Sequence, residues 1–286
     1  MDVAVTSITF LLVSEIAIVN ALTQFVSWKT KETFMRSKKK DQICALLKGI
    51  ETGDPEAVTV VNEGKYIQHN PLTREGNVGL AELFKRLSKT SPRVEIVRVF
   101  EDGDFVFAHT DYDFNVVEVG FEVFRFEDGL VVEHWDNLQS KPDDPNPSGH
   151  TMLDGSTETT DLDKTEENRA LIRSFVEEAL VGDQLSRLDH YIDSEGYVEH
   201  NLKMSDGLPA LREALANNRE ARRYDKIHRL LAEGNFVLCV CEGHLDDRHV
   251  SFYDLFRVAD GKIVEHWDTV DPVPPRSEWV NNNGKF

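Results

Sequence analysis

The chain has 286 residues, with 32 Lys and Arg against 51 Asp and Glu, and a net charge of −19 at pH 7. This length predicts about two domains, and a composition that is 40% hydrophobic and 29% charged excludes a wholly disordered chain. Nucleic acids and anionic membranes need a basic protein surface. We therefore expect no nucleic-acid partner.

Residues 1–37 form an apolar N-terminal extension, in which residues 3–28 are long enough to cross a bilayer. Glu15 lies in the middle of that stretch, where a carboxylate is costly in lipid. Asp2 replaces the basic start of a secretory signal, and no clear cleavage site follows. We favour a surface helix, or an extension without function that precedes an alternative start at Met35, over a membrane anchor. If the protein contacts a membrane at all, we expect it to do so through residues 3–28.

The three cysteines, an odd number, are Cys44, Cys239 and Cys241. They make no disulfide framework, and no Cys/His spacing typical of a zinc site is present. Reduced thiols fit a reducing compartment, so we expect a cytoplasmic location.

An internal repeat determines the predicted architecture. Tyr66–Asn70 recurs with two changes at Tyr197–Asn201, and Glu133–Asp136 recurs unchanged at Glu265–Asp268, an offset near 131 residues. That offset is the size of a whole domain and is too long for a solenoid unit. We predict two copies of one domain, with these boundaries: first domain 38–140, a linker rich in proline, glycine and acids 141–165, second domain 166–275 and tail 276–286.

Each copy begins with a predicted helix and ends with predicted strands. Apolar residues recur at helical spacing around residues 43–50 and 171–179, and again around 80–87 and 208–215. The strands that follow are joined by hairpin turns, and Asp-Gly at 128–129 and 260–261 is a strong hairpin signal. This order predicts an α+β fold, in which helices lie on one face of a curved, mainly antiparallel sheet and enclose an apolar cavity.

Four motifs together carry a resemblance to a known family. They are Tyr-Ile-Gln-His-Asn-Pro at 66–71, a strand that ends in His109, the Phe-Arg-Phe-x-Asp-Gly turn at 124–129, and Glu-His-Trp-Asp at 133–136. This combination resembles the SnoaL-like polyketide cyclases of the NTF2-like superfold. The resemblance implies two cone-shaped domains, whose sheets pair as an intramolecular pseudo-dimer or in a homo-oligomer. It also implies cofactor-free acid–base chemistry on a small hydrophobic carbonyl compound, such as aldol-type cyclisation, isomerisation or dehydration.

The resemblance indicates an acid on the strand before the Phe-Arg pair, which corresponds to Glu122 in the first copy and Asp254 in the second. Strand alternation places each acid on the same face as the neighbouring apolar side chains. Burial there raises the pKa of a carboxyl group and suits it to general acid or base catalysis. The alternative is a partly exposed acid at a strand end, or one paired with arginine.

Histidines supply the other catalytic candidates. His134 and His266 each share a strand face with an aspartate two residues later, so each is either a proton shuttle or part of a structural hydrogen bond. His69 and His200 precede a loop at the expected mouth of the cavity, where they would act as a base or orient substrate. The expected substrate-binding residues are Tyr66, Asn70, His109, Asp136, Tyr197, Asn201 and Asp268.

The two copies differ at two of these positions. The first carries His109 where the second has Val240, and Glu122 where the second has Asp254. A metal site would need His69, His109, His134 and Glu122 to converge; since no metal-ligand motif is present, we expect no metal and no cofactor. The sequence also lacks phosphate-loop, GxSxG and dinucleotide motifs. An enzyme active in either copy and a non-catalytic ligand-binding or interaction module both stay open, because this superfold hosts both.

Overall fold

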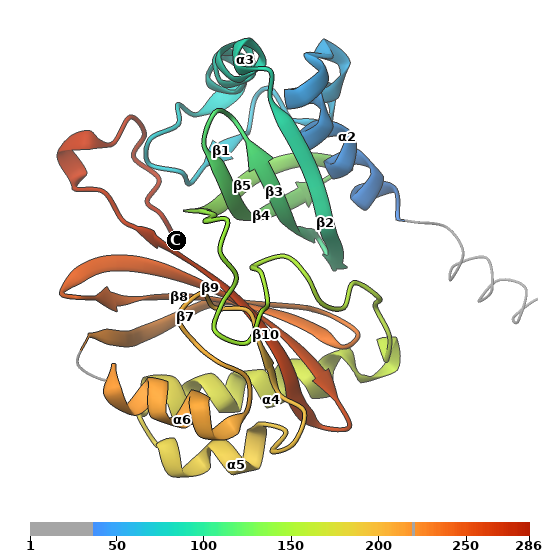
Figure 1. Ribbon diagram of the computed structural model, residues 1–286. Helices are drawn as coiled ribbons and strands as arrows, with labels where there is room; N and C mark the ends of the chain where they lie inside the picture. The colour runs from blue at the N-terminus through green and yellow to red at the C-terminus, as the bar shows by residue number, and fades with distance from the viewer. Residues whose placement is uncertain (1–36, 219–220) are drawn as a thin grey trace, which may run out of the picture.

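The computed structural model describes residues 37–218 and 221–286, which form two domains with the same order of elements, apart from the short helix α5 of the second (Figure 1). The predicted extension 1–37 lies outside the described residues except for Ser37. The first domain consists of α2 (Lys38–Thr52), β1 (Ile67–Gln68), α3 (Gly76–Leu87), β2 (Arg93–Asp102), β3 (Phe105–Asp113), β4 (Val117–Glu127) and β5 (Leu130–Ser140). The second consists of α4 (Thr165–Phe175), α5 (Leu188–Tyr191), β6 (Val198–Glu199), α6 (Leu208–Asn217), β7 (Arg222–Glu233), β8 (Phe236–Leu245), β9 (Arg248–Ala259) and β10 (Lys262–Pro272).

Each domain contains one five-stranded sheet. The strand orders are β1-β5-β4-β3-β2 and β6-β10-β9-β8-β7, and only the short first strand of each domain pairs in parallel. The predicted Asp-Gly turns join β4 to β5 and β9 to β10. Asp128 and Gly129 have φ angles of 52° and 79°, as a two-residue hairpin turn with positive φ at both positions requires. The α+β fold class and the two NTF2-like domains predicted from the sequence are confirmed.

The first helix of the first domain illustrates how local sequence sets these elements. Ser37 caps α2 by accepting a hydrogen bond from the Lys39 amide, and the helix ends at Gly53 in the left-handed conformation, with φ of 70°. The apolar residues of α2 are buried, and they face the sheet: Ile43, Leu46, Leu47 and Ile50.

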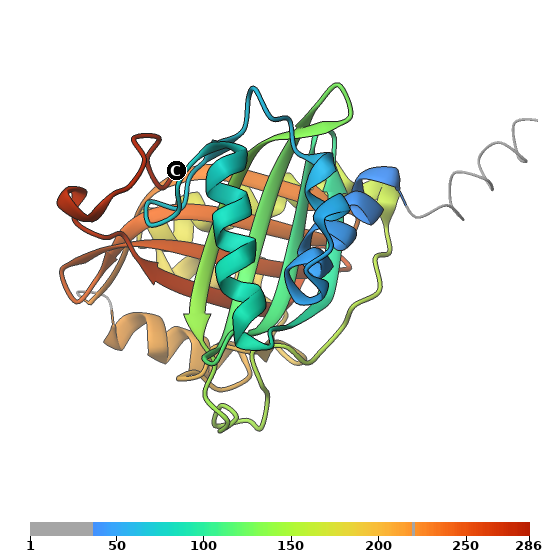
Figure 2. The same cartoon turned by 90° about the horizontal axis from the view of Figure 1, so that it is seen from above.

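The helices cover the outer face of each sheet, and the two inner faces pack against each other. In Figure 1, α2 and α3 lie above the upper sheet, while α4 and α6 lie below the lower one; Figure 2 shows the strands of the two sheets crossing at a steep angle. The layer between the sheets is an aromatic and aliphatic cluster to which both domains contribute, including Phe107, Phe121, Trp135, Phe236, Leu255 and Trp267. Together with the two cores under the helices, this cluster makes the described chain a four-layer structure.

Each domain is also held by a segment that follows the other domain. The linker after β5 crosses the second domain, where Asn146 Nδ2 donates to the Glu199 carbonyl at 2.6 Å. The tail after β10 returns to the first domain, where Asn281 Nδ2 donates to the Asn70 carbonyl at 2.7 Å. Both segments therefore bind the backbone next to the repeated Tyr-x-x-His-Asn motif, and they do so reciprocally.

Within the described ranges, 37–218 and 221–286, no helix combines the length and apolar content needed to cross a bilayer.

Candidate active site

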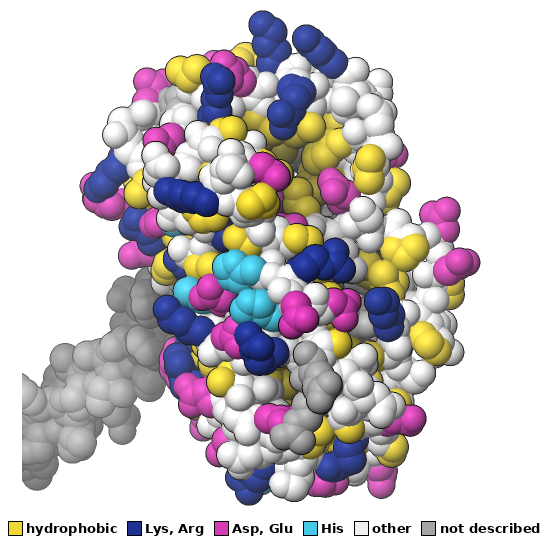
Figure 3. All heavy atoms as spheres, turned by 90° about the vertical axis from the view of Figure 1, so that its left-hand side faces the viewer, with side chains coloured by type: hydrophobic (Ala, Val, Ile, Leu, Met, Phe, Trp, Pro, Cys, Tyr) yellow, Lys and Arg dark blue, Asp and Glu magenta, His cyan; other side chains and the backbone are white. Residues whose placement is uncertain are grey.

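The first domain contains a cavity of about 510 Å³ between its helices and the concave face of its sheet. Its apolar wall comes from leucines and phenylalanines of α2, α3 and the sheet, and hydrophobic side chains gather in a hollow of this domain in Figure 3. Leu72 and Val116 lie at its rim and are 57% and 55% exposed. The polar groups of the lining include Tyr66, Gln68, Asn70, Glu122, His134 and Asp136.

Strand register brings the polar side chains into one row. Glu122 on β4 pairs with Asp136 on β5, and the neighbouring pair on the same face is Phe124 with His134. Gln68 on β1 pairs with His134 from the other side of β5. Because side chains alternate across a strand, these residues face the cavity together while their sequence neighbours face the other domain.

His134 and Glu122 form a buried acid–base pair. His134 Nε2 lies 2.6 Å from Glu122 Oε2, His134 Nδ1 lies 3.1 Å from Gln68 Oε1, and Tyr112 donates to Glu122 Oε1 at 2.8 Å. Burial raises the pKa of Glu122. Burial alone would lower the pKa of His134, but the hydrogen bond and charge of Glu122 outweigh it and raise that pKa. Each ring nitrogen therefore has an oxygen partner, and the His134–Glu122 pair can hold and release a proton.

Asp136 lines the cavity, and only one of its two carboxylate oxygens accepts a hydrogen bond from the described residues. Asn70 Nδ2 donates to Asp136 Oδ2 at 2.8 Å, whereas the buried Oδ1 accepts no hydrogen bond from the described residues. Lys285 Nζ lies 3.6 Å from that Oδ1 and also pairs with Asp271 Oδ2 at 2.5 Å. Lys285 is only 3% exposed and is not part of the cavity wall, so its charge reaches Asp136 without filling the cavity.

Tyr66 places a hydroxyl donor in the same cavity. Its oxygen lies 3.4 Å from Gln68 Nε2, which donates to it, and within the described part of the chain no acceptor takes the hydroxyl hydrogen. Burial raises the pKa of Tyr66 far above its ordinary value, and the charges of Glu122 and Asp136 raise it further. The hydroxyl therefore stays protonated at all physiological pH values and can donate to a ligand.

The corresponding space in the second domain is nearly filled, with about 20 Å³ left beside Asp254 and His266. Arg222, the first residue of β7, donates to Asp268 Oδ2 at 2.8 Å and lies 3.7 Å from Asp254 Oδ1. Its guanidinium stacks over Phe252, 4.8 Å from the ring centre. The first domain has Gly120 at the strand position of Phe252, and the ring of Tyr112 and the side chain of Leu138 pack in the space that a side chain there would take.

A separate pocket of about 410 Å³ opens farther out in the second domain, and its walls include neither Asp254 nor His266. Arg222 borders both this pocket and the small remnant, and so it separates one from the other. Tyr197 lines the remnant and Asn201 borders the outer pocket. The second domain therefore keeps the predicted polar residues but closes the space between them.

The buried histidine of the second domain sits between two carboxylates. His266 Nδ1 lies 2.8 Å from Glu199 Oε1, and Nε2 lies 3.1 Å from Asp254 Oδ1. Glu199 stands where the first domain has Gln68, and Tyr197 donates to its other oxygen at 2.7 Å. Although burial lowers the pKa of His266, the charge of Glu199 and the hydrogen bond to Asp254 raise it to about 10.

This raised pKa predicts a pH-dependent stability. In the unfolded chain His266 has its ordinary pKa near 6.5, so the stabilisation is complete below pH 6.5 and is lost as pH rises toward 10. At roughly 1.4 kcal/mol per pKa unit, the upper limit is about 4–5 kcal/mol. Urea unfolding between pH 6.5 and 10 should show this fall, and His266→Gln should flatten it. An equal slope in that variant would contradict the assignment.

His69 and His200 do not line a cavity, and the expectation that they lie at its mouth is wrong. His69 lies on the opposite face of its strand from Gln68 and Asn70, stacked on Trp135 at 4.5 Å, with Nε2 2.9 Å from Glu133 Oε1. His200 stacks on Trp267 at 4.7 Å in the same manner. Alternation along the strand explains both positions, because the residues flanking each histidine face the helices.

His109 is likewise outside the cavity. It is buried between the sheets, stacked on Phe121 at 4.3 Å, with Nδ1 3.1 Å from Arg98 Nη1. The four residues considered for a metal site therefore divide between two faces of the sheet. A tighter group, Glu122, His134 and Asp136, has ligand atoms within 4.8 Å of one another, although Glu122 and His134 already bind each other.

Six residues of these sites were not predicted from the sequence: Gln68, Tyr112, Glu199, Arg222, Tyr224, which donates to Asp254 at 3.0 Å, and Lys285. The change from Gln68 to Glu199 could have been noticed in the sequence, since it is one of only two changes between the two copies of the Tyr-x-x-His-Asn motif. Tyr112 could have been placed by alternation on β3. Arg222, Tyr224 and Lys285 gave no signal, because two of them precede a strand irregularity and the third lies in the tail.

Two α+β domains, each with its polar row between helices and a curved sheet, define the NTF2-like class. A family model for the SnoaL-like domain matches residues 44–134 and 172–266, which together make up more than half of the chain. The chain therefore belongs to the SnoaL-like family.

Among curated proteins, no sequence matches this chain. Similar solved structures include an LEH-like epoxide hydrolase from M. tuberculosis, with 24% identity, a TM-score of 0.32, and coverage of 38% of this chain and 85% of that one. IdmH, a candidate polyketide cyclase from Streptomyces antibioticus, has 16% identity and a TM-score of 0.32, covering 36% and 93%. An NTF2-like protein of unknown function from Cytophaga hutchinsonii has 17% identity and a TM-score of 0.32, covering 37% and 94%. Each likeness spans about one domain and assigns no activity to this chain.

Proposed function

We propose that the first domain is a cofactor-free acid–base catalyst that removes a proton next to the carbonyl of a small hydrophobic compound. The observation that carries this proposal is that one apolar cavity is lined both by Asp136, whose buried Oδ1 accepts no hydrogen bond from the described residues, and by Tyr66, whose hydroxyl hydrogen has no acceptor among them. A base and an oxyanion donor are the two groups that enolisation requires.

In the proposed step the Asp136 carboxylate takes the α-proton, the C–H electron pair forms the carbon–carbon double bond, and the carbonyl oxygen gains the negative charge. The Tyr66 hydroxyl donates a hydrogen bond to that oxygen. Asp136 or the His134–Glu122 pair then returns a proton to carbon or oxygen. Protonation at a different carbon would give isomerisation, and attack of the enolate on a second carbonyl would give ring closure.

The cavity wall supports a hydrophobic substrate. About 510 Å³ holds a compound of one or two rings, and leucines and phenylalanines make up most of the apolar wall, with Arg86 and Glu118 also among the lining residues. An apolar surrounding also strengthens the hydrogen bond from Tyr66 to a developing enolate, because water cannot screen it. Arg222 occupies the matching space of the second domain, so we propose that this domain has a structural role.

The test is exchange of α-protons for deuterium. The full chain is incubated in D₂O with 1-tetralone and with smaller and larger cyclic ketones, and deuterium incorporation is followed by NMR and mass spectrometry. We expect exchange above the buffer rate for the ketones that fit the cavity. Saturable ketone binding without exchange would instead support a ligand-binding module, and neither binding nor exchange would contradict the proposed substrate class.

The tail should matter for this activity, although it follows the second domain in the chain. Lys285→Met removes the cation beside Asp136, and we expect exchange to slow about tenfold, with a larger loss at low pH, because an isolated buried carboxylate takes up a proton more readily. Lys285→Arg keeps the charge and should restore most of the rate. A pH–rate profile identical for Lys285→Met and the unchanged chain would contradict this role.

A further inference from the structure

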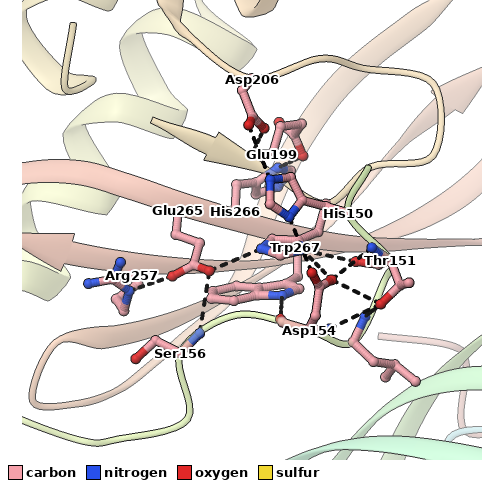
Figure 4. A network of polar contacts seen from close by, with 12 residues as sticks. His150, Thr151, Asp154, Ser156, Glu199, Asp206, Arg257, Glu265, His266 and Trp267 are labelled. Atoms are coloured by element: carbon pink, nitrogen blue, oxygen red, sulfur yellow. Dashed lines mark hydrogen bonds and ion pairs between the residues drawn. The ribbon is translucent and has the colours of Figure 1, made fainter. Parts of the chain in front are cut away.

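A cluster of two histidines and one aspartate lies outside the cavity, where the linker crosses the second domain (Figure 4). His150 and Asp154, both labelled in Figure 4, belong to the linker. His200 directly follows β6. His150 Nδ1 lies 3.2 Å from Asp154 Oδ2, and His200 Nδ1 lies 3.1 Å from Asp154 Oδ1. One ligand atom from each of the three residues lies within 4.8 Å of the others, which is close enough for all three to bind one ion.

The far nitrogen of each ring is already bound to a carboxylate. His150 Nε2 lies 3.1 Å from Asp206 Oδ2, and His200 Nε2 lies 3.0 Å from Glu265 Oε1. Arg257 in turn holds Glu265, at 2.6 Å from its other oxygen. A histidine that binds a metal typically donates its second N–H to a carboxylate in this way, which fixes the ring and leaves the near nitrogen free for the ion.

The oxygen donors are also held in place. The backbone N–H and hydroxyl of Thr151 donate to Asp154 Oδ1 at 2.7 and 2.9 Å, so the carboxylate does not turn freely. The carbonyl oxygen of Thr151 lies 2.8 Å from His200 Nδ1 and accepts a hydrogen bond from that nitrogen when it carries hydrogen. An ion that replaces this proton would find that carbonyl as a fourth donor. Two imidazole nitrogens with one carboxylate and one further oxygen suit Zn²⁺ better than Mg²⁺ or Ca²⁺.

We propose that His150, Asp154 and His200 form a Zn²⁺ site that fastens the linker to the second domain. The same linker also contacts the first domain, because Arg98 donates to the carbonyls of Asp154 and Ser156, each at 2.7 Å. A metal ion at Asp154 would therefore stabilise the position of both domains.

The first domain provides the matched control. His69 has the equivalent far partner, Glu133, and an equivalent carbonyl, that of Gly284, at 2.9 Å each. No histidine or aspartate of the described residues completes a ligand group with it. Removing the ring of His69 should therefore leave Zn²⁺ binding intact.

The experiment titrates Zn²⁺ into the chelator-treated full chain, by calorimetry and by thermal unfolding. We expect one tight site per chain, a higher unfolding temperature with Zn²⁺ but not with Mg²⁺, and affinity that falls below pH 7 as protons compete. His150→Ala lies in the linker and Asp154→Asn keeps the shape of its side chain, so both variants should fold. Each should weaken binding by at least about 100-fold, since even second partners of a ligand are worth 10–100-fold.

Two variants separate this site from other places on the chain. His69→Ala and Glu122→Gln, the latter in the cavity cluster, should bind Zn²⁺ as tightly as the unchanged chain. Tight binding that survives His150→Ala, or that is lost in Glu122→Gln, would overturn the proposal, as would the absence of tight binding. None of these results bears on ketone exchange, so this proposal and the proposed function fail separately.

Discussion

Asp136→Asn is expected to slow α-proton exchange by about 10³-fold while leaving the cavity open. General bases contribute on the order of 10²–10⁴-fold, and asparagine keeps the shape of the side chain but cannot accept the proton. Asn70 would still find an oxygen acceptor at position 136, so the loop that carries it should stay in place. The measurement is deuterium incorporation into 1-tetralone at fixed enzyme concentration, with ketone affinity determined in parallel.

The control is Asp268→Asn, the same substitution at the repeated position of the second domain. Asp268 pairs with Arg222 and faces no open cavity, so exchange should continue at the unchanged rate in this variant. Circular dichroism and urea unfolding verify that both variants fold. Equal exchange by folded Asp136→Asn and the unchanged chain would remove Asp136 from the proposed mechanism.

Arg222→Met is expected to lower the free energy of unfolding by about 3–5 kcal/mol at pH 7, because breaking a buried ion pair leaves charge without compensation. Asp268 and Asp254 would lose their nearest guanidinium while remaining buried. Burial would raise the pKa of Asp268, but the charge of Arg222 outweighs this and lowers it. The contribution of this pair is therefore present above the ordinary aspartate pKa and is lost as pH falls, so the loss in the variant should shrink in acid.

Two further variants test whether the burial of the Arg222–Asp268 pair determines this cost. Arg93 opens β2 as Arg222 opens β7, but its side chain is 46% exposed, so Arg93→Met should cost less than about 1 kcal/mol. The double change Arg222→Met with Asp268→Asn removes one of the stranded charges and should recover part of the loss. Urea denaturation of the four proteins is the measurement. A cost below 1 kcal/mol for Arg222→Met would show that Arg222 does not hold the second domain closed.

The sequence predicted the fold because its signals are local and occur twice. Helical spacing in residues 43–50 and the Asp-Gly turns specify elements that neighbouring residues alone can form, and the repeat shows that two copies exist. Alternation along a single strand also places His134 on the same face as Asp136, and His266 on the same face as Asp268.

The remaining parts of the site depend on features that spacing does not encode. A two-residue β1 gave no strand pattern, so the side of the sheet on which His69 lies was not determined. β7 carries two register shifts where β2 carries one. The extra shift changes the positions of Arg222 and Tyr224 on β7 relative to the corresponding residues of β2. As a result, the tyrosine that donates to the buried acid comes from β7 in the second domain (Tyr224 to Asp254) and from β3 in the first (Tyr112 to Glu122). Lys285 reaches Asp136 only through the return of the tail, a contact between residues 149 positions apart.

We propose that, among the described residues, the first domain holds the catalytic cavity and that Arg222 closes the matching space of the second domain. The deciding measurement is methyl NMR of the leucines during titration with 1-tetralone. We predict saturable shifts at Leu46, Leu80 and Leu83, which line the first cavity, and none at Leu180 and Leu211 beside the second. Shifts confined to Leu180 and Leu211, or equal in both domains, would contradict the claim.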